Sequence, residues 1–175
     1  MDKKMVYIVV AVLVVVIVVG VAGVMLLNQG GNGGTTTPTP TPTPVAVSEA
    51  TSLQFSVDQT TNNVLVGYTY TCKNFNASDE ILRVDMCLAE GNYSYIIDLG
   101  AQKSYASMDG GATWTATNFA DDCTNYVTPF HNIVDKLIAN GDTNADYTYT
   151  ENGTTNKVYC IAVNPTIADS VFKTS

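Results

Sequence analysis

Residues that could perform catalysis are few in this chain. His131 is the single histidine, and it stands four residues before Asp135 in a stretch with helical spacing. A histidine–carboxylate pair needs a nucleophile beside it, and no serine or cysteine has a recognisable nucleophile setting. The chain also lacks a glycine-rich phosphate loop. The sequence therefore predicts a surface pair at His131, no cofactor and no enzymatic activity.

A metal centre is not predicted either. No two cysteines have the C-x2-C spacing of a zinc site, and a single histidine adds little to such a site. The adjacent acids Asp121 and Asp122 are the best calcium candidates. A solvated loop is the simpler interpretation of this pair, and we expect a loop there.

The four cysteines, Cys72, Cys87, Cys123 and Cys160, predict two disulfides if their domain lies outside the cytoplasm. Strand alternation places Cys72 and Cys87 on opposite faces, which excludes a bridge between them. Two pairings remain: 72–123 with 87–160, or 72–160 with 87–123. We favour the second pairing.

The segment Ser107–Trp114 matches S-x-D-x-G-x-T-W, the Asp-box, and resembles hairpins of sialidase-type propellers and other secreted β proteins. In such a turn the side chain of Asp109 caps backbone amides, glycines supply unusual φ, and Trp114 packs beneath the hairpin. A propeller needs several blades, and this chain is too short for them. The motif therefore predicts a stable turn.

Alternating apolar and polar residues dominate the second part of the chain and predict antiparallel strands. The expected strands cover 53–57, 64–72, 81–88, 93–99, 103–108, 113–117, 146–150 and 157–163. One segment, 129–139, has helical spacing instead, with Thr128 as N-cap and a stop at Asn140-Gly141. A short helical turn is expected after Pro165. The predicted fold class is α+β: a curved antiparallel meander, like an incomplete barrel, with one covering helix.

A transmembrane helix is predicted at 5–27, which is uncharged and long enough to cross a bilayer. Lys3 and Lys4 precede it, so the positive-inside rule leaves 1–4 in the cytoplasm and the bulk outside. A cleaved signal peptide ending at 21–23 is the alternative, but the apolar run continues beyond that point. Residues 28–44 form a Gly- and Thr-Pro-rich tether. We expect a single-pass cell-membrane protein with one extracytoplasmic domain, 45–175.

The charge of that domain limits its partners. It carries six basic and fifteen acidic residues, a net charge of about −9, which argues against binding nucleic acid or anionic lipid surfaces. Three N-glycosylation sequons begin at Asn76, Asn92 and Asn152. No protein partner can be named from the sequence.

A family resemblance comes from the strand order. The strands LQFSVD, VGYTYTCKN and ILRVDM, the hairpin EGNYSYIIDLGAQKSY and the tail IADSVFK resemble the outer-membrane lipoprotein carrier superfamily. Arg83, Gln102 and Tyr105 match positions of its motifs. The resemblance implies a strongly curved sheet whose concave side, plugged by helices, binds acyl chains.

Two functions follow from these patterns. In a carrier-like module, a lipid or other apolar ligand would lie between sheet and helix, lined by Tyr68, Tyr70, Phe130, Val134, Leu137 and Ile138. In the alternative, a structural or adhesive surface domain, these residues fill a solid core. Tyrosines on a strand face usually pack against neighbouring strands, but they also suit an apolar or glycan ligand. A cavity of a few hundred cubic ångströms under the helix would distinguish the two functions.

Overall fold

The computed structural model describes residues 46–88 and 90–174. The predicted cytoplasmic tip (1–4), transmembrane helix (5–27) and tether (28–44) lie outside the described residues and stay predictions. Among the described residues, no helix is both long and apolar enough to cross a membrane.

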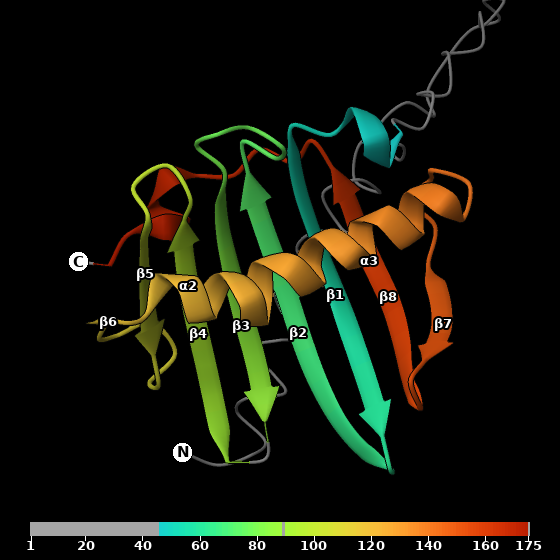
Figure 1. Cartoon of the computed structure of the whole chain (residues 1–175), viewed down its shortest axis with the longest axis horizontal. Coiled ribbons are helices and arrows are strands. Elements are labelled where there is room, and N and C mark those ends of the chain that lie inside the picture. Colours follow the sequence, from blue (N-terminus) through green and yellow to red (C-terminus); the bar gives the residue numbers. More distant parts are fainter. Residues whose placement is uncertain (1–45, 89, 175) are drawn as a thin grey trace, which may run out of the picture. The chain divides into compact units, whose positions relative to one another are not determined.

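An open, eight-stranded antiparallel sheet forms the frame of the domain (Figure 1). In chain order the strands are β1 (Ser52–Thr61), β2 (Val64–Lys73), β3 (Ile81–Leu88), β4 (Gly91–Asp98), β5 (Lys103–Ser107), β6 (Thr115–Ala116), β7 (Tyr147–Glu151) and β8 (Thr154–Val163). Their order in space is β6-β5-β4-β3-β2-β1-β8-β7. The predicted meander is therefore confirmed for β1 to β6, and the last hairpin returns to lie beside β1.

Two-residue turns join β1 to β2 and β7 to β8. Asn62 and Asn63 have φ of 51° and 63°, and Asn152 and Gly153 have φ of 50° and 78°. Positive φ at both central positions matches the twist of the flanking strands, which is why Asn and Gly occur in such turns. The first turn lets β1 run to Thr61, beyond the predicted strand 53–57.

The connection from β6 to β7 is helical and crosses the sheet from one edge to the other (Figure 1). It consists of α2 (Phe119–Asp122), the π-helical η2 (Cys123–Val127) and α3 (Thr128–Ala139). The helix predicted at 129–139 is confirmed. Its predicted N-cap is wrong, because helical structure already begins at Phe119 and the side chain of Asn118 caps it.

Two short 3-10 helices flank the sheet. The first, η1 (Val47–Glu49), precedes β1, and the second, η3 (Asp169–Phe172), is the turn predicted after Pro165. The side chain and backbone amide of Ser48 both donate to Asp142, which follows α3. This contact fixes the start of the domain to the C-terminal end of the covering helix.

The core lies between α3 and one face of the sheet, called the inner face here. Alternation along β1 and β2 brings Leu53, Phe55 and Cys72 to this face, where they are fully buried. On α3 the buried positions are Phe130, Ile133, Val134 and Leu137. The apolar stripe predicted for the helix therefore packs on the apolar face predicted for the strands.

Candidate binding faces

The six residues predicted to bind an apolar ligand all lie at the interface between sheet and helix. Tyr70, Phe130, Val134 and Leu137 are at most 2% exposed, and Tyr68 and Ile138 are partly buried against the same cluster. The sequence pattern therefore identified six residues that do lie together in the structure. It did not determine whether these side chains leave a cavity or fill the space between them.

Aromatic side chains occupy the space under the first turn of α3. The ring of Phe130 stacks on Phe55 with centroids 5.6 Å apart and planes 5° apart. It also contacts Tyr70 at 5.7 Å and meets the edge of Phe75 at 5.9 Å. Such spacings are those of directly touching rings. This part of the interface has the packing of a solid core.

A row of half-buried tyrosines, called the tyrosine belt here, borders this core. Its members are Tyr68 on β2, Tyr95 on β4, Tyr126 on η2, and Tyr147 and Tyr149 on β7. The rings of Tyr95 and Tyr126 lie 4.2 Å apart, and those of Tyr147 and Tyr149 lie 5.5 Å apart. Burial raises the pKa of Tyr68, and it raises the pKa of Tyr149 to about 12.

The side chain of Asn156, on β8, also lies on the inner face of the sheet and is 5% exposed. It lies in register between Gln59 on β1 and Tyr149 on β7. Its Nδ2 donates to the Thr154 carbonyl at 3.4 Å, whereas its Oδ1 is buried and lacks a hydrogen-bond partner. Buried polar atoms are nearly always paired, so Oδ1 of Asn156 is an exception among the described residues.

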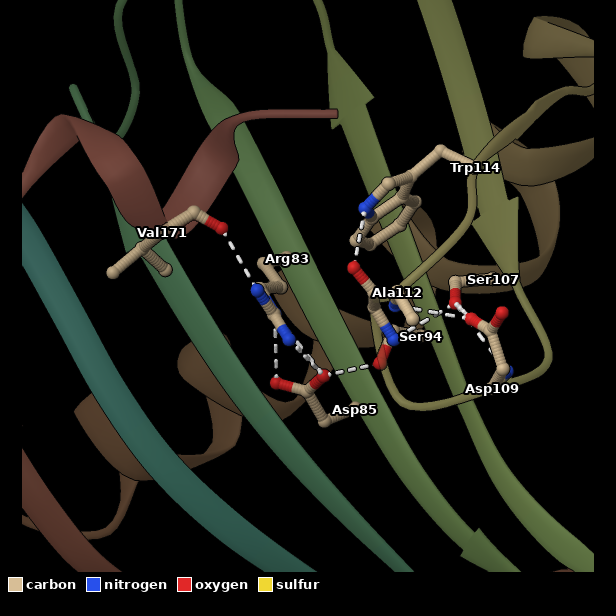
Figure 2. Close-up of polar contacts among 9 residues, drawn as sticks. Arg83, Asp85, Ser94, Ser107, Asp109, Ala112, Trp114 and Val171 are labelled. Carbon is tan, nitrogen blue, oxygen red and sulfur yellow. Dashed lines mark hydrogen bonds and ion pairs between the residues drawn. The ribbon is translucent and has the colours of Figure 1, made fainter. Parts of the chain in front are cut away.

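The opposite, outer face of the sheet is organised around Arg83 (Figure 2). Its guanidinium donates to both carboxylate oxygens of Asp85 and to the Val171 carbonyl at 2.9 Å. The guanidinium also lies 5.7 Å from the centroid of the Trp114 ring. Ser94 donates to Asp85 at 2.6 Å. Arg83 thus joins the C-terminal segment, the sheet and the Asp-box, which is a structural role.

The Asp-box has the geometry predicted for a stable turn. Asp109 accepts hydrogen bonds from the backbone amides of Ala112 and Thr113, at 3.0 and 2.9 Å, and from the Thr113 hydroxyl at 2.6 Å. These bonds hold the pKa of Asp109 far below its usual range, with the Thr113 hydroxyl as the largest cause. The Trp114 indole donates to the Gly111 carbonyl at 3.1 Å. The side chains that define the motif are thus engaged with one another.

His131 does not form the predicted surface pair with Asp135. Its Nε2 lies 2.9 Å from Oε1 of Glu80, a side chain that is only 1% exposed. The other oxygen of Glu80 accepts the Asn76 amide at 2.9 Å. The hydrogen bond with Glu80 raises the pKa of His131, against an opposing effect of burial. A buried glutamate in the β2–β3 loop has no sequence signature, so this contact could not be predicted.

The predicted disulfides are absent from the structure, in which all four cysteines are free thiols. Cys72 is buried in the core, Cys123 is half-buried, and Cys87 and Cys160 are exposed. The opposite facing of Cys72 and Cys87 is as predicted. Neither of the pairings 72–123 with 87–160 and 72–160 with 87–123 is formed.

The predicted loop at Asp121 and Asp122 is also wrong, because both residues lie in α2. Asp122 is 6% exposed and accepts a hydrogen bond of 2.5 Å from the Thr117 hydroxyl. Its carboxylate therefore holds the start of the helical segment and is not an exposed calcium ligand. Among residues 46–88 and 90–174, no three potential metal-ligating side chains form a cluster. The sequon residues Asn76, Asn92 and Asn152 are all exposed.

A cavity of about 450 Å³ lies away from the covering helix. It is lined by Lys73, Asn74, Asp79, Ile81, Asp98, Asp169, Phe172 and Lys173. Lys73 and Asp169, both in its lining, form an ion pair with each other. It is distinct from the acyl-chain site predicted under α3.

Comparison of this chain with protein families, with curated proteins and with solved structures finds no match.

Proposed function

We propose that residues 45–175 form an extracytoplasmic interaction module, held at the membrane by the predicted helix 5–27, that recognises its partners on its surface. The observation that supports this proposal best is the contact between α3 and the inner face. Phe130, Val134 and Leu137 are at most 2% exposed, and the Phe130 ring touches three other aromatic rings. A carrier would need room for an acyl chain at this interface.

The lipid-carrier resemblance provides the alternative function. An acyl chain buried between sheet and helix would gain about 0.8 kcal/mol per methylene, enough for micromolar affinity after association costs. Such a chain would have to displace the side chains that now fill the interface, or the sheet and α3 would have to separate. The carrier-like curvature of the sheet and an apolar ligand remain predictions of that alternative.

Leu137→Trp separates the two functions. In a solid core the larger ring overpacks its surroundings, and we expect a loss of roughly 1–3 kcal/mol in the free energy of unfolding. Purified domain 45–175 should also fail to bind a fluorescent fatty acid, before and after substitution. Urea denaturation and fluorescence titration measure the two quantities.

The matched control is Asn132→Trp, which puts the same ring on the exposed side of the same helix. It should leave the stability within about 0.5 kcal/mol of the unsubstituted domain. Micromolar fatty-acid binding that Leu137→Trp abolishes without a loss of stability would contradict the solid-core function and favour the carrier.

A further inference from the structure

We propose that two copies of this chain pair along β7, edge to edge, as a two-fold symmetric dimer; this deepens, and rests on, the proposed function as a surface interaction module. β7 is the last strand on one side of the sheet, and among the described residues no strand pairs with its far side (Figure 1). The strand at the other side, β6, is only two residues long. β7 therefore offers the longer unpaired edge of the two, and another strand is what completes such an edge.

The turn between β7 and β8 decides which backbone groups of β7 face outward. Glu151 and Thr154 flank this two-residue turn and lie opposite each other in register. In such a hairpin the flanking pair exchanges both backbone hydrogen bonds, and bonded pairs then alternate with unbonded pairs along the strands. The residues of the unbonded pairs are Thr148 and Thr150, which are exposed. Their N–H and C=O groups therefore point away from β8, toward the open edge.

The sequence of β7 suits pairing with a second copy of itself. With the two-fold axis at Tyr149, Thr148 of each copy lies opposite Thr150 of the other, and each of these two pairs can exchange two backbone hydrogen bonds. Tyr149 then faces its counterpart in an unbonded pair, where side chains lie closest and aromatic residues pair well. The register that satisfies the backbone thus also matches the side chains.

No like charges face each other in this register. Glu151 lies opposite Tyr147, and the carboxylate of Glu151 is already 3.1 Å from the Lys136 ammonium. Asp146 lies opposite the uncharged Asn152. β7 also lacks the lysine, proline or bulge that commonly blocks an exposed edge. The net charge of about −9 on each domain opposes association, but at physiological ionic strength charges more than about 8 Å apart are largely screened.

The contact is small, which restricts where the dimer forms. Four backbone hydrogen bonds along a five-residue strand bury less than the roughly 1,200 Å² of a stable soluble interface. The helix predicted at 5–27 would confine the copies to one membrane and raise their effective concentration. We therefore expect the dimer in the membrane and a monomer in dilute solution of the soluble domain.

Cysteine crosslinking of the full chain in lipid vesicles tests the register. The starting chain carries Cys87→Ser and Cys160→Ser, which remove the two exposed thiols. Tyr149→Cys then places two thiols in the unbonded pair at the axis, where the Cα atoms would be about 4.5 Å apart, within reach of a disulfide. Copper-phenanthroline in air should join chains at position 149, as identified by mass spectrometry. Tyr147→Cys is the matched control on the same strand and face, because its two copies would be about 13 Å apart; it should crosslink at least tenfold less.

Proline substitution tests the backbone. Since the N–H groups of Thr148 and Thr150 point away from β8, Thr148→Pro or Thr150→Pro should leave the hairpin folded while removing an edge donor. Combined with Tyr149→Cys, each should lower crosslinking at least tenfold and keep a cooperative melting transition. Thr148→Val keeps the N–H and the β-branched shape, so it should crosslink as before.

Three outcomes would overturn the dimer: equal crosslinking at positions 147 and 149, no crosslinking at position 149, or crosslinking at 149 that both prolines leave unchanged. Unfolding by either proline would show that these N–H groups are already bonded within the chain, and would overturn it as well. Each of these results leaves the surface-recognition function standing. Fatty-acid uptake blocked by Leu137→Trp in the same vesicles would instead contradict the proposed function itself.

Discussion

Glu80 is a carboxylate that the fold buries almost completely, at 1% exposure. Two donors meet its charge, His131 on α3 and the backbone amide of Asn76. The ring of His131 also stacks against Phe75 at 5.5 Å. One histidine therefore ties the covering helix to the β2–β3 loop, and its protonation state affects how firmly the two are held together.

The stability of the domain should depend on pH through this pair. The hydrogen bond to Glu80 raises the pKa of His131 in the folded state above its ordinary value of 6.5. The folded state therefore binds this proton more tightly than the unfolded state does. The resulting stabilisation is fully present below about pH 6.5 and is lost as the pH rises through the raised pKa. Urea denaturation at pH 6 and pH 9 measures the difference.

His131→Gln is the variant that tests this prediction, because glutamine can donate to Glu80 but does not titrate. Its stability relative to the unsubstituted domain should be lowest at pH 6 and should recover toward pH 9. Asp135→Asn, at an exposed position on the same helix, should keep most of the original pH dependence. An equal pH dependence in His131→Gln and the original domain would show that another group titrates.

Among the elements, those with long periodic patterns were the predictable ones. β2 and β3 were expected at 64–72 and 81–88 and occupy Val64–Lys73 and Ile81–Leu88, because strict alternation matches a half-buried strand. α3 was found for the same reason at a different period. In both cases one buried face is enough to specify the element.

Elements defined by the rest of the fold were missed or displaced. α2 and η2 have four and five residues, too few for an apolar period, and they become helical as part of a longer crossing segment. β6 has only two residues, within the predicted strand 113–117. The prediction of the binding residues had the same limit. Alternation along a single strand located Tyr68 and Tyr70. The unpaired Oδ1 of Asn156 depends on neighbours from two other strands, which no single-strand pattern reveals.

Two glycines should respond oppositely to alanine. Gly67 lies in the interior of β2, where an added Cβ would meet only Asp58 Oδ1 at an ordinary 3.7 Å. Gly67→Ala should therefore stabilise the domain by about 0.5–1 kcal/mol, because glycine loses more conformational freedom on folding.

Gly111, in the Asp-box turn, has φ of +94° and is the matched comparison. Alanine is strained in that conformation, so Gly111→Ala should destabilise the domain by about 1 kcal/mol or more. Urea denaturation of both variants tests the assignment. Destabilisation by Gly67→Ala comparable to that of Gly111→Ala would mean that β2 tolerates no added side chain on the outer face.

At the scale of the whole molecule, the free cysteines allow a test of the predicted topology. Cys87 and Cys160 are exposed, whereas Cys72 is fully buried in the core. Burial, with a further contribution from Glu80, raises the pKa of the Cys72 thiol. Since the thiolate is the reactive form, Cys72 is protected from reagents both by the core and by its chemistry.

We expect a membrane-impermeant maleimide, added to intact cells, to label Cys87 and Cys160 within minutes and to leave Cys72 unlabelled until the protein is unfolded. The reason is that Lys3 and Lys4 are predicted to retain the N-terminus in the cytoplasm, with the domain outside. A cysteine introduced by Asp2→Cys should stay protected until the cells are lysed, and Cys87→Ser with Cys160→Ser should reduce the external signal to slow labelling of the half-buried Cys123. Mass spectrometry of the labelled peptides identifies each site.

Labelling at residue 2 in intact cells, with Cys87 and Cys160 protected, would reverse the predicted orientation. A bridged peptide joining any two of the four cysteines would show that the thiols oxidise once the domain is outside.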